Sequence, residues 1–228
     1  MVKQSEFLAT KVCRFYNPGL IEYQEALRLQ EGLAEKRIAG ETEDALILLE
    51  HQPVFTVGKS GGIDNILVPS EVLLQEGISV YYVKRGGDIT YHGPGQLVGY
   101  PIIKLRENGL DVHQYVWNLE EVIIRVLADL SISGRRVSDM PAYRGVWVEG
   151  EKVCAIGIQV TRGVTMHGFA LNVNPDLHHF DFINPCGITG KAVTSVSKLL
   201  GRVVAVAEVK EKVLEHFAQV FKFKLVRG

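Results

Sequence analysis

The sequence predicts an α+β protein with a mixed, largely antiparallel sheet flanked by helices. Three strand-like segments follow one another from residue 145 onward: GVWV, KVCAIGIQV and TMHGFALNV. The pairs that separate them, Glu149-Gly150 and Arg162-Gly163, are typical of tight hairpin turns, so the segments predict an antiparallel meander. Two amphipathic helical patterns, in residues 23–38 and 112–130, precede this meander. Because strands occur before, between and after the helices and hairpins dominate, a doubly wound parallel sheet is disfavoured.

The first part of the chain is expected to combine short strands with one helix. Residues 8–15 are predicted to form a strand, followed by a turn at Asn17-Pro18-Gly19. Apolar residues at helical spacing then predict an amphipathic helix, carried by Tyr23, Ala26, Leu27, Leu33, Ala34 and Ile38. Residues 45–49, 54–57 and 78–83 are predicted to be short buried strands.

The second half contains a longer helix, an irregular segment and two closing helices. The helix of residues 112–130 begins at a capping-box-like pair, Asp111 and Gln114, and is expected to end near Ser131. Residues 174–191 show no regular pattern, and irregular segments of that length inside a compact domain are usually functional or disordered. Helices are predicted near residues 193–200 and 207–221.

Length and composition restrict the class of protein. The chain has 228 residues, 46% of them hydrophobic, and a formal net charge of −1, so we expect one folded domain over residues 1–228. The near-zero charge disfavours a nucleic-acid partner, and the longest apolar runs, five residues, are too short for a membrane span. The N-terminus lacks a signal-peptide pattern, and the three well-separated cysteines favour a reducing, cytoplasmic location.

The first candidate site is the segment RGGDITYHGPGQ, from Arg85 to Gln96. Its four glycines would let the backbone approach a ligand closely, although glycine spacing alone is equally typical of a surface turn. The segment has no Gly-Lys-Ser/Thr ending and no G-x-G-x-x-G spacing, so it does not fit a phosphate-binding loop. A shaped pocket wall at Tyr91 and His92 agrees better with the pattern.

The second and third candidates are Cys186 and Lys152. Cys186 lies between Pro185 and Gly187 in the irregular segment, whereas Cys13 and Cys154 fall in predicted strands and are expected to be buried and inert. Strict alternation places Lys152 on the same strand face as Cys154, where its amine either reaches water or is enclosed. An enclosed amine has a lowered pKa and can act as the base beside a thiol nucleophile.

Other chemistries are disfavoured by the same residues. His167 could replace Lys152 as the base, and His178, His179, Asp181 and Cys186 could be imagined around zinc. The sequence has neither C-x-x-C nor H-E-x-x-H, so zinc is disfavoured. It also lacks G-x-S-x-G, the motif that carries the nucleophilic serine of many serine hydrolases, so serine hydrolase chemistry is disfavoured.

The motifs together resemble those of the lipoyl(octanoyl) transferases, the octanoyl-[acyl-carrier-protein]:protein octanoyltransferases. They are RGGDITYHGPGQLVGYPI, GEKVCAIGIQV, HGFALNVNPDL and INPCGITGKAVTSV, in the order typical of the family. The resemblance implies a fold like the biotin/lipoate protein ligases, which is class II aminoacyl-tRNA synthetase-like. It also assigns Cys186 as the acyl-thioester nucleophile and Lys152 as the residue that transfers protons.

The implied substrate-binding residues form three stretches of the sequence. They are Arg85, Gly86, Gly87, Asp88, Ile89, Thr90, Tyr91 and His92; Ala155, Ile156 and Gly157; and Gly168, Phe169 and Ala170. The implied donor is octanoyl-acyl carrier protein, and the acceptors are lipoyl domains of 2-oxoacid dehydrogenase complexes and the glycine cleavage H protein. No cofactor and no metal ion are implied.

Two alternatives remain open from the sequence. An ATP-dependent lipoate or biotin ligase would share the fold but would not need Cys186, and it would consume ATP with a free acid. A non-catalytic acyl-binding module would hold its ligand without a covalent bond and would tolerate Cys186→Ser.

Overall fold

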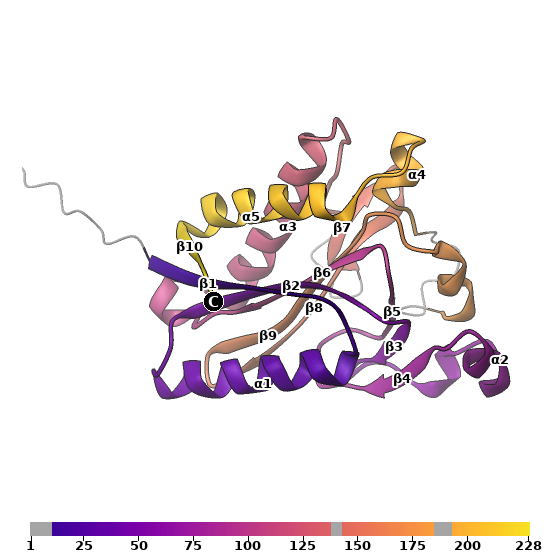
Figure 1. Cartoon of the computed structure of the whole chain (residues 1–228), viewed down its shortest axis with the longest axis horizontal. Coiled ribbons are helices and arrows are strands. Elements are labelled where there is room, and N and C mark those ends of the chain that lie inside the picture. Colours follow the sequence, from indigo (N-terminus) through magenta and orange to yellow (C-terminus); the bar gives the residue numbers. More distant parts are fainter. Residues whose placement is uncertain (1–10, 138–142, 185–192) are drawn as a thin grey trace, which may run out of the picture.

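The computed structural model describes residues 11–137, 143–184 and 193–228, and its main feature is a seven-stranded sheet of order β10-β1-β2-β6-β9-β8-β7 (Figure 1). The β10–β1 and β1–β2 pairs are parallel and the other four are antiparallel, which confirms the predicted mixed, largely antiparallel sheet. The strands are β1 (Lys11–Ile21), β2 (Asp44–His51), β6 (Gln96–Ile102), β7 (Gly145–Val148), β8 (Glu151–Thr161), β9 (Val164–Asn172) and β10 (Phe223–Arg227).

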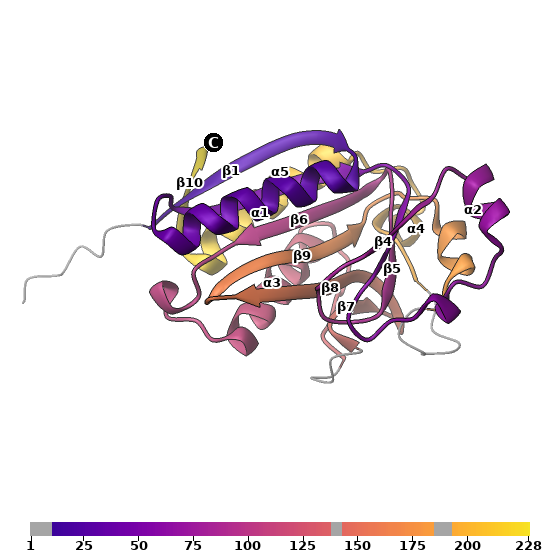
Figure 2. The same ribbon diagram turned by 90° about the horizontal axis from the view of Figure 1, so that it is seen from below.

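A smaller three-stranded sheet stands at one end of the large one. Its order is β4-β3-β5, with β3 at Val54–Val57, β4 at Ser79–Tyr82 and β5 at Ile89–His92. The short helix α2 (Ser70–Gln75) and the 3-10 helices η1 (Ile63–Asn65) and η4 (Leu177–Phe182) belong to the same region (Figure 2). The last part of the glycine-rich segment, residues 93–95, therefore joins the two sheets, because β5 ends at His92 and β6 begins at Gln96.

Helices cover both faces of the large sheet. The amphipathic helix α1 (Tyr23–Ala39) packs on one face, and α3 (Val112–Ala128) and α5 (Val206–Phe221) pack on the other (Figures 1 and 2). The short helix α4 (Val196–Leu200) precedes α5, and the 3-10 turn η2 (Arg106–Asn108) precedes α3. No helix among the described residues is long and apolar enough to cross a membrane.

The predicted helices and hairpins are confirmed, with end points shifted by a few residues. Asp111 caps α3 by accepting a hydrogen bond from the Gln114 N–H at 2.7 Å. Glu149-Gly150 and Arg162-Gly163 both have positive φ at both positions, which is the type I′ geometry that suits a two-residue hairpin. Cys13 and Cys154 are fully buried, as their strand positions predict.

The predicted turn at Asn17-Pro18-Gly19 is wrong, because these residues lie within β1. The parallel register to β2 shifts between Tyr16 and Gly19, and Gly19 has a φ of 82°. This irregularity accommodates Pro18, which has no N–H to donate to a ladder. The strand therefore continues through residues whose local preference is for a turn.

Three elements have no clear signal in the sequence: α2, β6 and β10. The central strand β6 contains Pro101, whose ring removes a backbone donor. The Thr165 hydroxyl donates to the Pro101 carbonyl at 2.7 Å and accepts from the Ile103 N–H at 2.9 Å. A side chain from β9 thus satisfies backbone groups of this segment beyond Gly99, the last β6 residue paired with β9, and only the tertiary structure reveals it.

Gly168→Ala is expected to lower the free energy of unfolding by about 1–3 kcal/mol, because the added methyl group would push against backbone atoms that cannot move without strain. A Cβ at Gly168 would lie 2.2 Å from the Gly99 carbonyl oxygen and 2.7 Å from the Cδ of Pro101. Gly32→Ala in helix α1 is the matched control, since nothing lies within 4 Å of its Cβ position. Chemical denaturation should show a loss for Gly168→Ala and a gain of about 0.5–1 kcal/mol for Gly32→Ala; equal stabilities would contradict the predicted close approach.

Candidate active site

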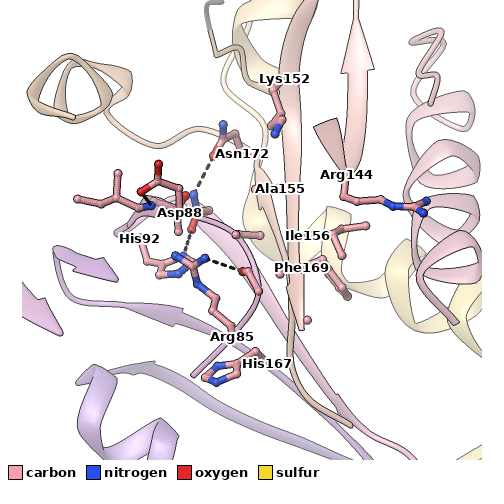
Figure 3. A pocket seen from close by; sticks show the side chains of 18 of the residues that line it. Arg85, Asp88, His92, Arg144, Lys152, Ala155, Ile156, His167, Phe169 and Asn172 are labelled. Atoms are coloured by element: carbon pink, nitrogen blue, oxygen red, sulfur yellow. Dashed lines mark hydrogen bonds between the residues drawn. The ribbon is translucent and has the colours of Figure 1, made fainter. Parts of the chain in front are cut away.

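One pocket lies between the two sheets and collects side chains from distant parts of the chain (Figure 3). Lys152 and Asn172 stand at one end, His167 stands at the other, and Arg85 and His92 lie between them. Two predicted binding stretches, 155–157 and 168–170, meet in the antiparallel β8–β9 pair, where Ala155 faces Ala170 and Gly157 faces Gly168.

Nearly all described residues of the predicted site line this pocket. They are Lys152, Arg85, Gly86, Gly87, Asp88, Ile89, Thr90, His92, Ala155, Ile156, Gly157, Gly168, Phe169 and Ala170. Tyr91 does not line the pocket, because its ring packs in the core of the small sheet. The centroid of the Tyr91 ring lies 5.9 Å from that of Phe55 and 5.5 Å from that of Phe180. Cys186 lies outside the described residues.

Several other pocket residues have little sequence signal of their own. These residues are Tyr23, Arg144, Trp147 and Phe180, which line the pocket beside the predicted stretches. Five further lining residues fall within the motifs quoted above: Gln96, Tyr100, His167, Asn172 and Val193. Trp147 reaches the site because it is the cross-strand partner of Lys152 in the β7–β8 pair, a register that spacing along the chain does not give.

Arg85 is fixed across the pocket by backbone and side-chain acceptors. Its Nη2 donates to the Thr56 carbonyl at 2.6 Å and to the Thr56 hydroxyl at 2.9 Å, and its Nη1 donates to the Gly86 carbonyl at 3.1 Å. Gly157 lies directly against this arrangement, since a Cβ there would be 3.1 Å from the Cδ of Arg85. Glycine at 157 therefore allows strand β8 to approach the Arg85 side chain closely.

Lys152 sits at an irregularity in strand β8. The β7–β8 register shifts between Val146 and Trp147, and the consecutive residues Val153 and Cys154 are both buried in the main core. Strict alternation therefore fails, and the predicted shared face of Lys152 and Cys154 is wrong. The bulge instead turns Lys152 into the pocket, where its Nζ lies 4.8 Å from the Trp147 ring centroid.

The two described cysteines are poor nucleophiles. Burial raises the pKa of both the Cys13 and the Cys154 thiols, so neither forms a thiolate readily near neutral pH.

The described residues on either side of the segment that contains Cys186 connect to the pocket. The Asn184 N–H donates to the Asn65 carbonyl at 2.8 Å, the Asn65 side chain binds the pocket residue Asp88, and Val193 lines the pocket.

The pocket histidines are neutral near pH 7. Desolvation lowers the pKa of His167 to about 4, with a smaller contribution from Arg85, and it lowers the pKa of buried His92 well below its ordinary value. His51, behind His92, has its pKa lowered to about 4 by the same cause. Such imidazoles are weak bases, which leaves Lys152 as the stronger candidate for proton transfer.

The fold is shared with solved structures of protein ligases. The structure resembles lipoate-protein ligase A bound with ATP (TM-score 0.80, 15% identity, covering 95% of this chain and 88% of that one). It also resembles biotin protein ligase from Aquifex aeolicus in complex with biotin and ATP (TM-score 0.55, 14% identity, 93% and 71% covered). These likenesses confirm the predicted biotin/lipoate ligase-like fold.

Sequence similarity is more specific than the fold. Residues 22–218 match the family model of the lipoyl protein ligase A/B catalytic domain. The chain is 51% identical to an octanoyltransferase of Caldicellulosiruptor saccharolyticus over 210 residues (91% of this chain, 88% of the relative). It is 47% identical to one of Alkaliphilus metalliredigens (92% and 95% covered). The chain therefore belongs to the octanoyltransferase family, and the predicted family membership is confirmed.

Proposed function

We propose that this chain transfers an octanoyl group from octanoyl-acyl carrier protein to a lysine of a lipoyl domain, through a thioester on Cys186. The observation that carries the proposal is the convergence of three separate motif stretches and Lys152 on one pocket. Burying an eight-carbon acyl tail there would contribute roughly 5 kcal/mol, at about 0.8 kcal/mol per CH₂. The apolar contacts available to the tail include Ile89, Ala155 and Phe169.

The first step would form the acyl-enzyme. Lys152 accepts the Cys186 thiol proton, and the thiolate attacks the carbonyl carbon of the octanoyl thioester. The bond between this carbon and the donor sulfur then breaks as the tetrahedral intermediate collapses. The Lys152 ammonium returns its proton to the departing pantetheine thiolate, so charge and protons balance.

The second step would release the product as an amide. The neutral amine of the acceptor lysine attacks the Cys186 thioester, a C–N bond forms, and the C–S bond to Cys186 breaks. Lys152 accepts the proton that the new amide loses and passes it to the departing Cys186 thiolate, which restores the thiol and the neutral amine. Because a thioester is converted to an amide, the reaction runs downhill and requires no ATP.

The proposed partners follow from this chemistry. The donor is an acylated carrier protein, and the acceptors are the lipoyl domains of 2-oxoacid dehydrogenase complexes and the glycine cleavage H protein. One relative in fold is described as part of a bi-partite lipoate protein ligase and its E2 lipoyl domain from Thermoplasma acidophilum, which supports a lipoyl-domain acceptor. We place the reaction in the cytoplasm, and we propose one catalytic domain over residues 1–228.

Donor specificity tests the proposal against an ATP-dependent ligase. With a lipoyl domain as acceptor, we expect amide formation from octanoyl-acyl carrier protein without ATP, and none from free octanoate or lipoate with Mg-ATP. The mass of the acceptor reports both reactions, and a lipoyl domain whose target lysine is replaced by arginine is the control. Modification that requires ATP and a free acid would instead establish a ligase.

A further inference from the structure

A buried glutamine joins the two sheets beside the pocket. The Nε2 of Gln96 donates to the Tyr91 carbonyl at 3.1 Å and to Asn172 Oδ1 at 2.9 Å, so both of its protons are used. Its Oε1 lies 2.7 Å from His92 Nδ1 and must therefore accept a hydrogen bond from the N–H of that nitrogen. The side chain is 1% exposed, and its orientation is fixed by these three bonds.

The connection continues from Gln96 to the backbone of Lys152. Asn172, which is 4% exposed, donates from Nδ2 to the Thr194 carbonyl at 3.0 Å. The Thr194 N–H donates to the Lys152 carbonyl at 3.0 Å, and Val193 forms a parallel bridge with Lys152. The first three donors point the same way, from His92 through Gln96 and Asn172 to the Thr194 carbonyl, and aligned bonds of this kind strengthen one another. The Thr194 N–H belongs to the preceding peptide group, so the backbone of Thr194 connects this chain of bonds to Lys152.

Lys152 has a particular need for such support. It lies where the β7–β8 register shifts, so the neighbouring ladder constrains its backbone less than in a regular strand. A base that is misplaced by about 1 Å loses much of its catalytic effect. On the side away from β7, the Lys152 backbone is held by the hydrogen bond from the Thr194 N–H and by the bridge to Val193. The Trp147 ring lies beside the Lys152 amine.

We propose that Gln96 and Asn172 are positioning residues that set the location of the Lys152 amine through Thr194. This inference rests on the proposed function of Lys152 in proton transfer. It assigns the two amides a task distinct from contact with the acyl group.

The first test measures the titration of Lys152 directly and needs no catalysis. The Lys152 amine is observed by NMR after ¹³C reductive methylation, with its signal assigned by Lys152→Arg. Asn172→Leu and Gln96→Met keep nearly the shape of each amide but remove its hydrogen bonds, and each should shift the amine pKa by at least about 0.5 unit. Asn118→Leu, which replaces another buried amide on α3, is the matched control and should cause no shift.

The second test asks whether Asn172 acts through Lys152. Asn172→Leu should slow acylation by octanoyl-acyl carrier protein about 10–100-fold while changing KM less than about twofold. In the Lys152→Arg background the same change should cost less than about twofold, because coupled residues are not additive. Equal costs in both backgrounds, or unshifted titrations, would overturn the inference. A wild-type enzyme that is never acylated would overturn the proposed function instead, and the NMR titration would still decide the role of the two amides.

Discussion

Cys186→Ala is expected to abolish the octanoyl adduct and to reduce transfer to a lipoyl domain by about 10³-fold or more. Removing a covalent nucleophile eliminates the two-step path, and only binding and electrostatic contributions remain. Cys13 and Cys154 cannot replace it, because both thiols are buried and burial raises the pKa of each. Turnover is measured by the mass of the lipoyl domain.

The matched controls are Cys13→Ala and Cys154→Ala. Each removes one buried sulfur from the core, so each should lower stability modestly and leave the acylation rate per folded molecule nearly unchanged. Cys186→Ser tests the remaining alternative, a non-catalytic acyl-binding module. If the protein were such a module, the Cys186→Ser variant would bind octanoyl groups as well as the wild type does. An active Cys186→Ala enzyme would contradict the assignment of the nucleophile.

Lys152→Arg is expected to separate the two half-reactions. Arginine keeps the positive charge, can lie over the Trp147 ring as lysine does, and can still favour a Cys186 thiolate. It cannot accept a proton near pH 7, and the loss of a general base costs about 10²–10⁴-fold. Enzyme acylation should therefore persist at a reduced rate, while transfer to the lipoyl domain is nearly lost. Single-turnover experiments measure the two steps separately.

Lys152→Met is the control for charge, because it keeps a long unbranched side chain without an amine. It should lose acylation as well as transfer, with folding checked by thermal denaturation. Near-normal transfer by the arginine variant would show that Lys152 acts only through its charge or its packing. The base would then have to be His92 or His167, despite the desolvation that lowers the pKa of each.

The fold class and the meander could be predicted because local and tertiary preferences agree there. The type I′ hairpins at Glu149-Gly150 and Arg162-Gly163 need positive φ, and alternating apolar residues flank them. Local preference failed where tertiary contacts override it. Asn17-Pro18-Gly19 remains in a strand because β2 pairs on both sides of the irregularity. Strand β6 continues through Pro101, where the Thr165 hydroxyl satisfies the Pro101 carbonyl and the Ile103 N–H.

The site residues were found mostly through motifs rather than periodicity. Alternation alone misplaced Lys152, because the bulge at Val153 cannot be seen in a sequence in which every residue from 153 to 160 is compatible with a regular strand. Tyr91 lies between the pocket residues Thr90 and His92 yet packs in a separate core, since neighbouring strand residues face opposite sides. The links from Gln96 to Asn172 and from Asn172 to Thr194 depend on contacts between distant segments, so only the structure gives them.

The central claim is an acyl-enzyme on Cys186, and one measurement tests it most directly. The protein is incubated with octanoyl-acyl carrier protein without acceptor, its intact mass is recorded, and the modified peptide is sequenced by tandem mass spectrometry. The account predicts a single octanoyl adduct on Cys186 that hydroxylamine removes and that a lipoyl domain discharges. An adduct on Cys154 or Cys13, or octanoyl transfer that proceeds with no adduct on any cysteine, would contradict it.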